Sequence, residues 1–181
     1  MDINKDIFSS GQVGSKIWLC EELEKLGWTS NLTYIYGGWC GVLGFLLLSR
    51  GNFQVNQIQS FDIDPSCEPI ADMINENFVW KDWKFKAYTL DCNEHIRGNP
   101  DLVINTSTEH FESMNWYNNI PKGTHVIFQG NNMNHDDHTS TINNLDEFVS
   151  QYDLSSIDFT GELDFVYPDW GFTRYMIIGT K

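Results

Sequence analysis

The chain has 181 residues, of which 41% are hydrophobic and 14% aromatic, and its formal net charge is −14. A chain of this length and aromatic content is expected to fold as one domain with its own core rather than to remain disordered. The negative charge disfavours nucleic acid as a partner, because an acidic surface repels phosphate backbones, and it suits a neutral or cationic small molecule better. The simpler interpretation, that acidity only keeps the protein soluble, stays open.

The cysteines and the first residues indicate a reducing compartment. No two cysteines form a C-x-x-C pair and their spacing matches no zinc pattern, so buried reduced thiols and no metal are expected. The start, MDINKDIF, lacks the basic and apolar regions of a signal peptide, and the longest apolar run, 42–48, is too short to cross a membrane. These features predict a cytoplasmic protein without a membrane partner. The cysteines are Cys20, Cys40, Cys67 and Cys92.

Hydrophobic periodicity predicts alternating helices and strands, followed by two strands. We expect Ser15 to cap the first helix and Gly27 to end it, and Asp64 to cap a later helix that has Pro65 in its first turn. The alternation is typical of a parallel sheet with helices on both faces, and the two closing strands are typical of an antiparallel hairpin. The predicted strands cover residues 32–36, 57–62, 85–90, 102–105, 125–129, 157–166 and 172–178, and the predicted helices cover 15–26, 42–49, 65–74, 111–117 and 142–151.

Ligands of such a sheet bind beyond the carboxyl ends of its strands. Gly37, Gly38 and Gly41 follow the first predicted strand, where glycines permit a tight turn and a close approach of a ligand to the backbone. Their spacing is not G-x-G-x-x-G, so they do not match the dinucleotide fingerprint and can also serve the turn alone. Asp62 ends the second strand, where a carboxylate can accept hydrogen bonds from ribose hydroxyls or act as a cap or turn residue.

Polar residues also follow the third and fourth strands. Asp91 can accept a hydrogen bond from an adenine amino group, or lie at the surface as an ordinary aspartate. Asn105 can orient a substrate, and Glu109 and His110 can act as an acid or a base. The alternative for Glu109 is a place in the first turn of a helix capped by Thr108.

Two further polar segments are candidates for the site. Before the first strand, Gln12, Ser15 and Lys16 can hold a ligand carboxylate or can form only a loop and a helix cap, and the segment lacks the full spacing of a phosphate loop. In the run His135-Asp136-Asp137-His138, the side chains are of metal-binding types, but their spacing indicates no fourth ligand. We therefore expect a polar loop that closes over the substrate, with either histidine as a proton acceptor.

Four aromatic residues can form a pocket around a cation, or can belong to the ordinary core and surface. The loop position of the first of them is expected to bring it near a ligand. These residues are Trp39, Trp116, Tyr117 and Trp170.

The order of these motifs resembles that of the class I S-adenosylmethionine (SAM)-dependent methyltransferases. The resemblance covers residues 31–181 and rests on YIYGGWCG, SFDIDP, TLDC and DLVINTS, followed by a hairpin that ends in FTRYMIIGTK. It implies an α/β, Rossmann-like, doubly wound sheet of seven strands in the order 3-2-1-4-5-7-6, mostly parallel with an antiparallel C-terminal strand. Two positions depart from the family, since Ile35 stands where an acid is usual and Trp39 where a middle glycine is common. The motif that begins at Asn105 is also not the Asn-Pro-Pro-Tyr type that marks methylation of amino groups on bases or glutamine.

The resemblance also implies which residues hold SAM. Gly37 and Gly41 would pass beneath its methionine and ribose portions. Asp62 would take the ribose diol, Asp91 the adenine, and Asn105 the region of the sulfonium. The set implied for the cofactor is Gln12, Lys16, Gly37, Gly38, Trp39, Gly41, Asp62, Ile63, Asp91, Cys92, Asn105 and Thr106, and the set for catalysis is Asn105, Glu109, His110 and His138.

The expected function is methyl transfer from SAM to a small-molecule acceptor, or less readily to a protein, with S-adenosylhomocysteine as the product. Two alternatives stay open: an enzyme that cleaves SAM or uses it otherwise on the same fold, and a non-catalytic binding or partner protein. We expect one domain over residues 1–181 with residues 1–30 as a helical cap segment, and a homo-oligomer remains open.

Overall fold

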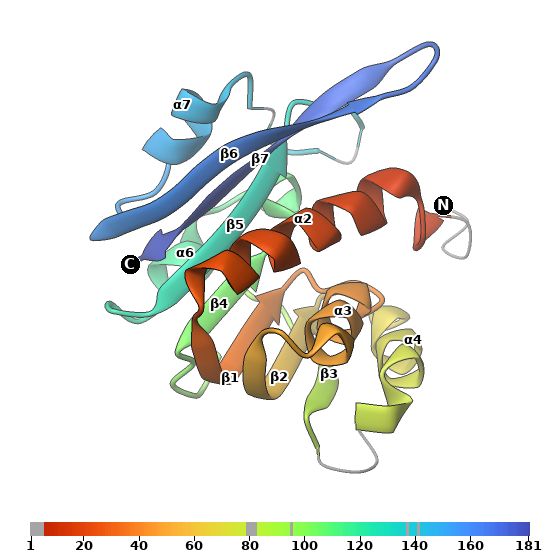
Figure 1. Ribbon diagram of the computed structural model, residues 1–181, viewed down its shortest axis with the longest axis vertical. Helices are drawn as coiled ribbons and strands as arrows, with labels where there is room; N and C mark the ends of the chain where they lie inside the picture. Colours follow the sequence, from red (N-terminus) through yellow and green to blue (C-terminus); the bar gives the residue numbers. More distant parts are fainter. Residues whose placement is uncertain (1–5, 79–82, 95, 137, 141) are drawn as a thin grey trace.

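The computed structural model describes residues 6–78, 83–94, 96–136, 138–140 and 142–181. These residues form a seven-stranded sheet in the order β3-β2-β1-β4-β5-β7-β6 (Figure 1). Strands β1 to β5 are parallel, whereas β7 pairs antiparallel with both β5 and β6, so the predicted order and the closing hairpin are confirmed. The strands are β1 (Thr29–Tyr36), β2 (Gln54–Asp62), β3 (Phe85–Thr89), β4 (Leu102–Asn105), β5 (His125–Asn131), β6 (Ser156–Val166) and β7 (Gly171–Thr180).

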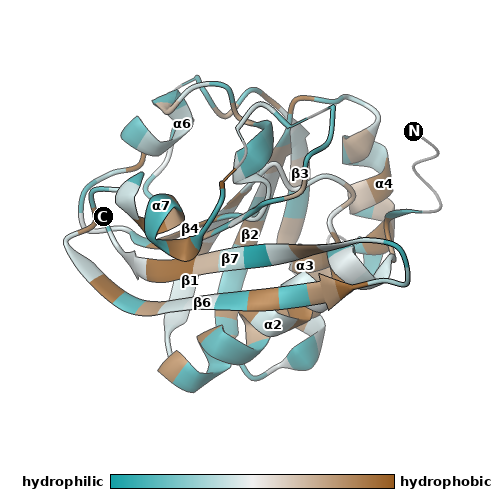
Figure 2. Ribbon diagram, turned by 90° about the horizontal axis from the view of Figure 1, so that it is seen from above, coloured by the Kyte–Doolittle hydropathy of each residue, from teal (hydrophilic) through white to brown (hydrophobic). Residues whose placement is uncertain are grey.

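Helices cover both faces of the sheet, as predicted. In the view from above, α2 lies on one side of the sheet and α6 and α7 lie on the other (Figure 2). Side chains of α2, α3 and α4 share a core with one face of the strands, and side chains of α6 and α7 share a second core with the opposite face. The helices are α2 (Ser10–Leu26), α3 (Val42–Arg50), α4 (Cys67–Ile74), α6 (Asn115–Asn118) and α7 (Leu145–Ser150), with a 3-10 turn η1 (Thr108–His110) after β4.

Strand β1 shows how the alternation of side chains builds the two cores. Ile35 points to the core with α2 and α3, whereas Tyr34 and Tyr36 point to the core with α6 and α7. The second core is rich in aromatic rings, and no helix connects β3 to β4 in the part of the chain that the structure describes. The Tyr34 hydroxyl instead donates to the carbonyl of Arg97 at 2.9 Å, and a Cβ on Gly98 would lie only 2.0 Å from that hydroxyl oxygen. Rings and a close-fitting loop therefore fill the space that a crossover helix would take.

The predicted starts of two helices were wrong. Helix α2 begins at Ser10 because Ser9 caps it, and Ser15 lies inside the helix, where its hydroxyl donates to the carbonyl of Gln12 at 3.1 Å. Helix α4 begins at Cys67 instead of Pro65, because the Asp64 carboxylate accepts from Ser66 N–H at 2.8 Å and closes a turn instead of capping the helix.

The segment after β4 also differs from the prediction. The helix expected over 111–117 is replaced by η1 and the short α6, and the Thr108 hydroxyl donates to the carbonyl of Gln129 at 2.9 Å instead of capping a helix. Helix α7 starts later than predicted because the Asn144 side chain accepts from Glu147 N–H at 2.8 Å as its N-cap. Strands β1 and β2 are longer than predicted, since polar residues at their starts still pair with each other, as Thr29 does with Gln54.

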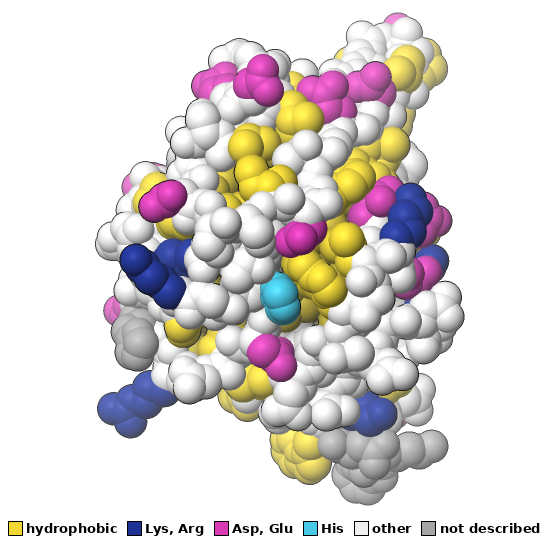
Figure 3. All heavy atoms as spheres, turned by 60° about the vertical axis from the view of Figure 1, so that its left-hand side comes forward, with side chains coloured by type: hydrophobic (Ala, Val, Ile, Leu, Met, Phe, Trp, Pro, Cys, Tyr) yellow, Lys and Arg dark blue, Asp and Glu magenta, His cyan; other side chains and the backbone are white. Residues whose placement is uncertain are grey.

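The surface carries the acidity that the composition predicts. On the face drawn in Figure 3, acidic side chains are spread among apolar ones and the basic side chains lie toward the margins of the view. All four cysteines are buried and free, in agreement with the prediction of buried thiols. No helix within the described residues combines the length and the apolar character that crossing a membrane requires.

Candidate active site at the carboxyl edge of the sheet

The register of the parallel strands brings the predicted glycine turn, Asp62 and Asn105 to one edge of the sheet. Tyr36, the last residue of β1, pairs with Phe61 in β2 and with Asn105, the last residue of β4. The glycine turn after Tyr36 and the residue Asp62 after Phe61 therefore emerge beside Asn105. This is the point where the strand order reverses, since β2 and β4 flank β1 on opposite sides. Ligands of open α/β sheets bind at such a point.

Each predicted glycine of the turn has a structural need. Gly37 and Gly41 have φ angles of +59° and +76°, which L side chains rarely adopt. A Cβ on Gly38 would lie 1.9 Å from the Ser60 hydroxyl oxygen. Side chains are therefore disfavoured at three positions of this turn, which follows β1 at the carboxyl edge of the sheet.

Trp39 occupies the same turn with a φ angle of +46°, a left-handed conformation that is unfavourable for a residue with a side chain. Conformations of this kind cost on the order of 1–3 kcal/mol each. Its indole is half-buried and packs against the small cluster formed by Ile7, Cys40 and Val42. The side chain therefore links the turn to the residues that precede α2.

Asp62 fixes this turn directly. One carboxylate oxygen accepts from Trp39 N–H at 2.8 Å and the other accepts from Asp64 N–H at 3.0 Å. A carboxylate oxygen has a second lone pair, so each can accept one more hydrogen bond. Asp62 therefore acts as a turn residue, which was the alternative prediction. Its remaining lone pairs can still accept hydrogen bonds from a ligand. The next residue, Ile63, presents an apolar side chain that is 69% exposed at the same edge.

Asp91 and Cys92 follow β3 with different environments. The Asp91 carboxylate accepts from the backbone and side-chain nitrogens of Asn93 at 2.8 and 3.1 Å, and the residue is half-buried. Cys92 is buried, and this burial raises the pKa of its thiol to about 12. Cys92 therefore acts as an apolar side chain near Gly37 and not as a thiolate nucleophile.

Asn105 is fully buried, and only one of the two polar atoms of its side-chain amide has a hydrogen-bond partner among the described residues. Its side-chain oxygen accepts from Ser107 N–H at 2.9 Å, whereas its side-chain nitrogen finds no hydrogen-bond partner among the described residues. A buried donor without a partner is unfavourable by about 1–3 kcal/mol, so its persistence at a ligand edge points to a polar ligand. The neighbouring Thr106 is also buried and uses its carbonyl to accept from Arg174 at 3.1 Å.

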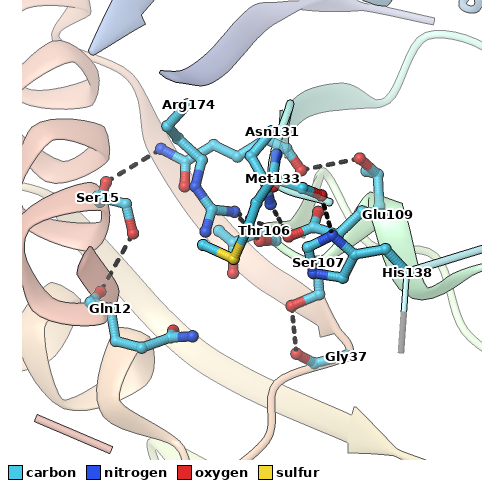
Figure 4. A network of polar contacts seen from close by, with 12 residues as sticks. Gln12, Ser15, Gly37, Thr106, Ser107, Glu109, Asn131, Met133, His138 and Arg174 are labelled. Atoms are coloured by element: carbon cyan, nitrogen blue, oxygen red, sulfur yellow. Dashed lines mark hydrogen bonds and ion pairs between the residues drawn. The ribbon is translucent and has the colours of Figure 1, made fainter. Parts of the chain in front are cut away.

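Glu109 belongs to a buried polar network that the sequence analysis found only in part. One Glu109 carboxylate oxygen accepts from the Asn131 side-chain amide and forms an ion pair with Arg174 at 3.2 Å (Figure 4). Asn131 in β5 and Arg174 in β7 are register partners, and both are buried. The sequence analysis missed these two residues, although a single arginine within the apolar run of β7 was a usable signal, since a buried charge requires a partner.

His110 and His138 lie beside Glu109. One ligand-type atom from each of these three side chains lies within 4.8 Å of the other two, and the two imidazole rings meet edge to face with centroids 4.9 Å apart. His138 Nδ1 lies 2.8 Å from the carbonyl oxygen of Met133. The three predicted catalytic side chains of η1 and the loop after β5 are therefore brought together. His135 contacts the His138 ring at a centroid distance of 5.6 Å, and Asp137 lies outside the described residues.

Gln12 and Lys16 face the interior from α2. The Lys16 ammonium donates to the side-chain and backbone oxygens of Gln12 at 2.6 and 3.3 Å. Burial first, and then the positive charge of Arg174, lower the pKa of Lys16 to about 7. Figure 4 shows Gln12 and Ser15 on one side of this network and Glu109 and His138 on the other, with Arg174 between them.

The predicted aromatic pocket is not formed. Trp116 and Tyr117 lie in the core with α6 and α7, where Trp116 packs edge to face on Tyr36 and Phe128. Trp170 is 54% exposed and stacks on Tyr167 in the hairpin between β6 and β7. Trp116 and Tyr117 therefore belong to the core and Trp170 to the surface, as the alternative interpretation predicted. Their rings contact other aromatic rings and do not surround a space for a cation.

Comparison with solved structures assigns the fold. The N-methyltransferase NodS from Bradyrhizobium japonicum WM9, in complex with S-adenosylhomocysteine, matches with a TM-score of 0.72 at 10% sequence identity, over 99% of this chain and 93% of that one. The magnesium protoporphyrin IX methyltransferase ChlM from Synechocystis PCC 6803, with bound SAM, matches with a TM-score of 0.66 at 15% identity, over 98% of this chain and 84% of that one. The chain therefore has the Rossmann-like fold of the class I SAM-dependent methyltransferases, as the sequence resemblance implied. No model of a known protein family matches the sequence, and no relative was found among curated proteins.

Proposed function

We propose that the chain binds SAM at the carboxyl edge of β1, β2 and β4 and transfers its methyl group to a small-molecule acceptor. The observation that carries the proposal is the glycine turn between Asp62 and Asn105, with hydrogen-bonding capacity left on both side chains. The fold is shared with methyltransferases whose structures hold SAM or S-adenosylhomocysteine. Residues 1–30 serve in this proposal as the helical cap segment of a single domain.

The adenosine half of SAM is assigned to the ends of β2 and β3. The remaining lone pairs of Asp62 accept from the two ribose hydroxyls, and Asp91 accepts from the adenine amino group. The exposed side chain of Ile63 covers one face of the adenine ring. Gly37, Gly38 and Gly41 permit the ligand to approach the backbone closely.

The methionine half is assigned to Lys16 and Gln12. Among the described residues, both hydrogen-bond partners of the Lys16 ammonium belong to Gln12, which carries no charge. A carboxylate ligand beside Lys16 would add an opposite charge to those of Glu109 and Asp6 and would raise the pKa of Lys16 again. The lowered pKa of this lysine thus supports a site for an anionic group.

The acceptor is assigned to the side of Asn105 that faces Glu109. When SAM is bound, its sulfonium supplies the electrophilic methyl group. A lone pair of the acceptor forms a bond to the methyl carbon, the carbon–sulfur bond breaks, and the acceptor proton passes to a base or to water. Asn105 and the neighbouring loops orient the acceptor and exclude water, which is most of what such a transfer requires of a protein.

Calorimetric titration with SAM and with S-adenosylhomocysteine tests the proposal. Asp62→Asn is expected to weaken SAM binding by about tenfold or more, because a hydrogen bond to a charged group contributes about 1.5–3 kcal/mol. Asp64→Asn is the matched control, since Asp64 lies two residues away and only closes the turn with Ser66. The proposal fails if neither ligand binds. Release of methylthioadenosine without an acceptor would instead favour a SAM-cleaving enzyme.

A further inference from the structure

We infer that Glu109, His110 and His138 form a binding site for one divalent transition-metal ion, with Zn²⁺ as the best match. A carboxylate oxygen and two imidazole nitrogens from these residues all lie within 4.8 Å of one another. Two of the residues come from η1 after β4, and the third comes from the loop after β5. The spacing of the cysteines and of the 135–138 run predicted no metal, because spacing along the chain does not report on side chains that meet only in the folded chain.

The carboxylate of Glu109 has one satisfied and one unsatisfied oxygen. Oε1 accepts from Asn131 and Arg174, whereas Oε2 is buried and finds no hydrogen-bond partner among the described residues. Glu109 is only 3% exposed, so water does not readily replace the missing partner. A buried carboxylate oxygen in this state is unfavourable unless a donor or a cation reaches it. A metal ion bound to Oε2 supplies that partner.

The ring of His138 is oriented as a metal ligand requires. Its Nδ1 lies 2.8 Å from the Met133 carbonyl oxygen, which can only accept, so Nδ1 carries the proton and Nε2 keeps its lone pair. Metal-binding histidines commonly make this second hydrogen bond to a carbonyl or carboxylate. The backbone N–H groups of Thr139 and Ser140 also donate to the Glu109 carbonyl at 2.9 and 3.3 Å. These bonds hold the loop of His138 against η1.

The donor set selects the class of ion. Two imidazoles and one carboxylate match zinc sites with an open fourth position and also non-haem iron sites, whereas Ca²⁺ and Mg²⁺ prefer oxygen ligands throughout. Ligand atoms about 2.0–2.2 Å from an ion lie roughly 3–3.5 Å apart, and the ligand-type atoms of these three side chains all lie within 4.8 Å of one another. Arg174 contacts the other carboxylate oxygen, and its charge is expected to moderate the affinity.

The open coordination position suggests what kind of acceptor the protein methylates, an extension that rests on the proposed function. A hydroxyl bound to a divalent ion loses its proton far more readily than a free hydroxyl does. The proton then passes to water, the oxygen forms its bond to the methyl carbon, and the carbon–sulfur bond of SAM breaks. The acceptor class is therefore an alcohol or a phenol, and not an amine.

Titration of the chelator-treated full chain with Zn²⁺, without SAM or acceptor, tests the site. About one ion per chain is expected to bind, and His110→Gln and His138→Gln are each expected to weaken binding at least about tenfold. His135→Gln is the matched control on the same loop, because His135 is outside the cluster of three. Thermal melting of each variant shows that it is folded. Absence of saturable binding would overturn the inference, and so would an equal loss in His135→Gln, since the loop pair would then be the site.

One further measurement keeps the outcomes distinct. Glu109→Gln removes the partner of Arg174 and can prevent folding, so the two histidine variants carry the test. SAM is titrated separately into the same metal-free protein. Zinc binding without SAM binding retains the metal site and refutes the proposed function, whereas SAM binding without zinc binding does the reverse.

Discussion

Replacing Lys16 by methionine is expected to stabilise the fold at neutral pH and to weaken the binding of SAM. Lys16 is 8% exposed, and within the described part of the chain its ammonium donates to oxygens of Gln12 alone. Methionine has a similar length and carries no charge, so the variant removes the buried base and retains most of the packing. When a residue serves function at the expense of stability, its substitution raises stability and lowers ligand affinity.

The magnitude follows from the pKa of Lys16, which burial lowers from 10.5 to about 7. Between these two pH values the unfolded chain binds the proton and the folded chain does not, so stability rises with pH across this range. The free-energy cost of folding around Lys16 is then about 4 kcal/mol at pH 7 and about 1 kcal/mol at pH 9.5. After about 1 kcal/mol is subtracted for the lost hydrogen bond to Gln12, Lys16→Met should stabilise the protein by about 3 kcal/mol at pH 7.

Urea unfolding of the wild type and the variant at pH 7 and pH 9.5 measures this difference. The advantage of Lys16→Met should shrink by about 3 kcal/mol between the two pH values, while its affinity for SAM falls by about tenfold or more. Lys25→Met is the control on the same helix, because Lys25 is 67% exposed and forms only a surface pair with Glu22. A variant that is less stable than the wild type by the same amount at both pH values would refute the reasoning.

Three other substitutions test the turn, the buried ion pair and the hairpin. Gly41→Ala should weaken SAM binding and lower the melting temperature more than Gly123→Ala does, because both glycines have positive φ but only at Gly41 would the new Cβ meet atoms closer than 3.0 Å. Arg174→Met should destabilise the protein by about 3–5 kcal/mol in urea unfolding, because it leaves the buried Glu109 carboxylate without its ion-pair partner. Adding Glu109→Gln removes that charge and should restore much of the lost stability. Trp170→Ala should leave SAM affinity unchanged by calorimetry, and a loss of tenfold or more would show that the hairpin reaches the ligand.

The fold could be predicted because its signals are local. Apolar runs such as 102–104 can be buried on both faces only as central parallel strands, and the structure places β4 over Leu102–Asn105. Helix ends were less predictable, because several residues compete for each cap. Ser9 and Ser15 both have a suitable hydroxyl, and the choice of Ser9 depends on α2 packing against the sheet up to its first turn.

The site could be predicted only where it follows a strand end. Asp62, Asp91 and Asn105 lie where the order of strands places them, and their positions required no knowledge of side-chain contacts. The partners of Glu109 could not be found this way, because Asn131 and Arg174 come from strands that become neighbours only when β7 inserts beside β5. A pairing across such a distance in sequence is determined by the sheet and not by any local spacing.

At Trp39 local preference and structure disagree. A glycine would adopt its left-handed backbone without strain, and the Asp62 carboxylate would still accept from the same N–H. The side chain must therefore contribute something that the turn alone does not need. Its contact with the cluster that contains Ile7 supplies a reason, because it ties the residues before α2 to the glycine turn. That tie supports the proposal that the N-terminal segment is a cap over the cofactor and not a separate appendage.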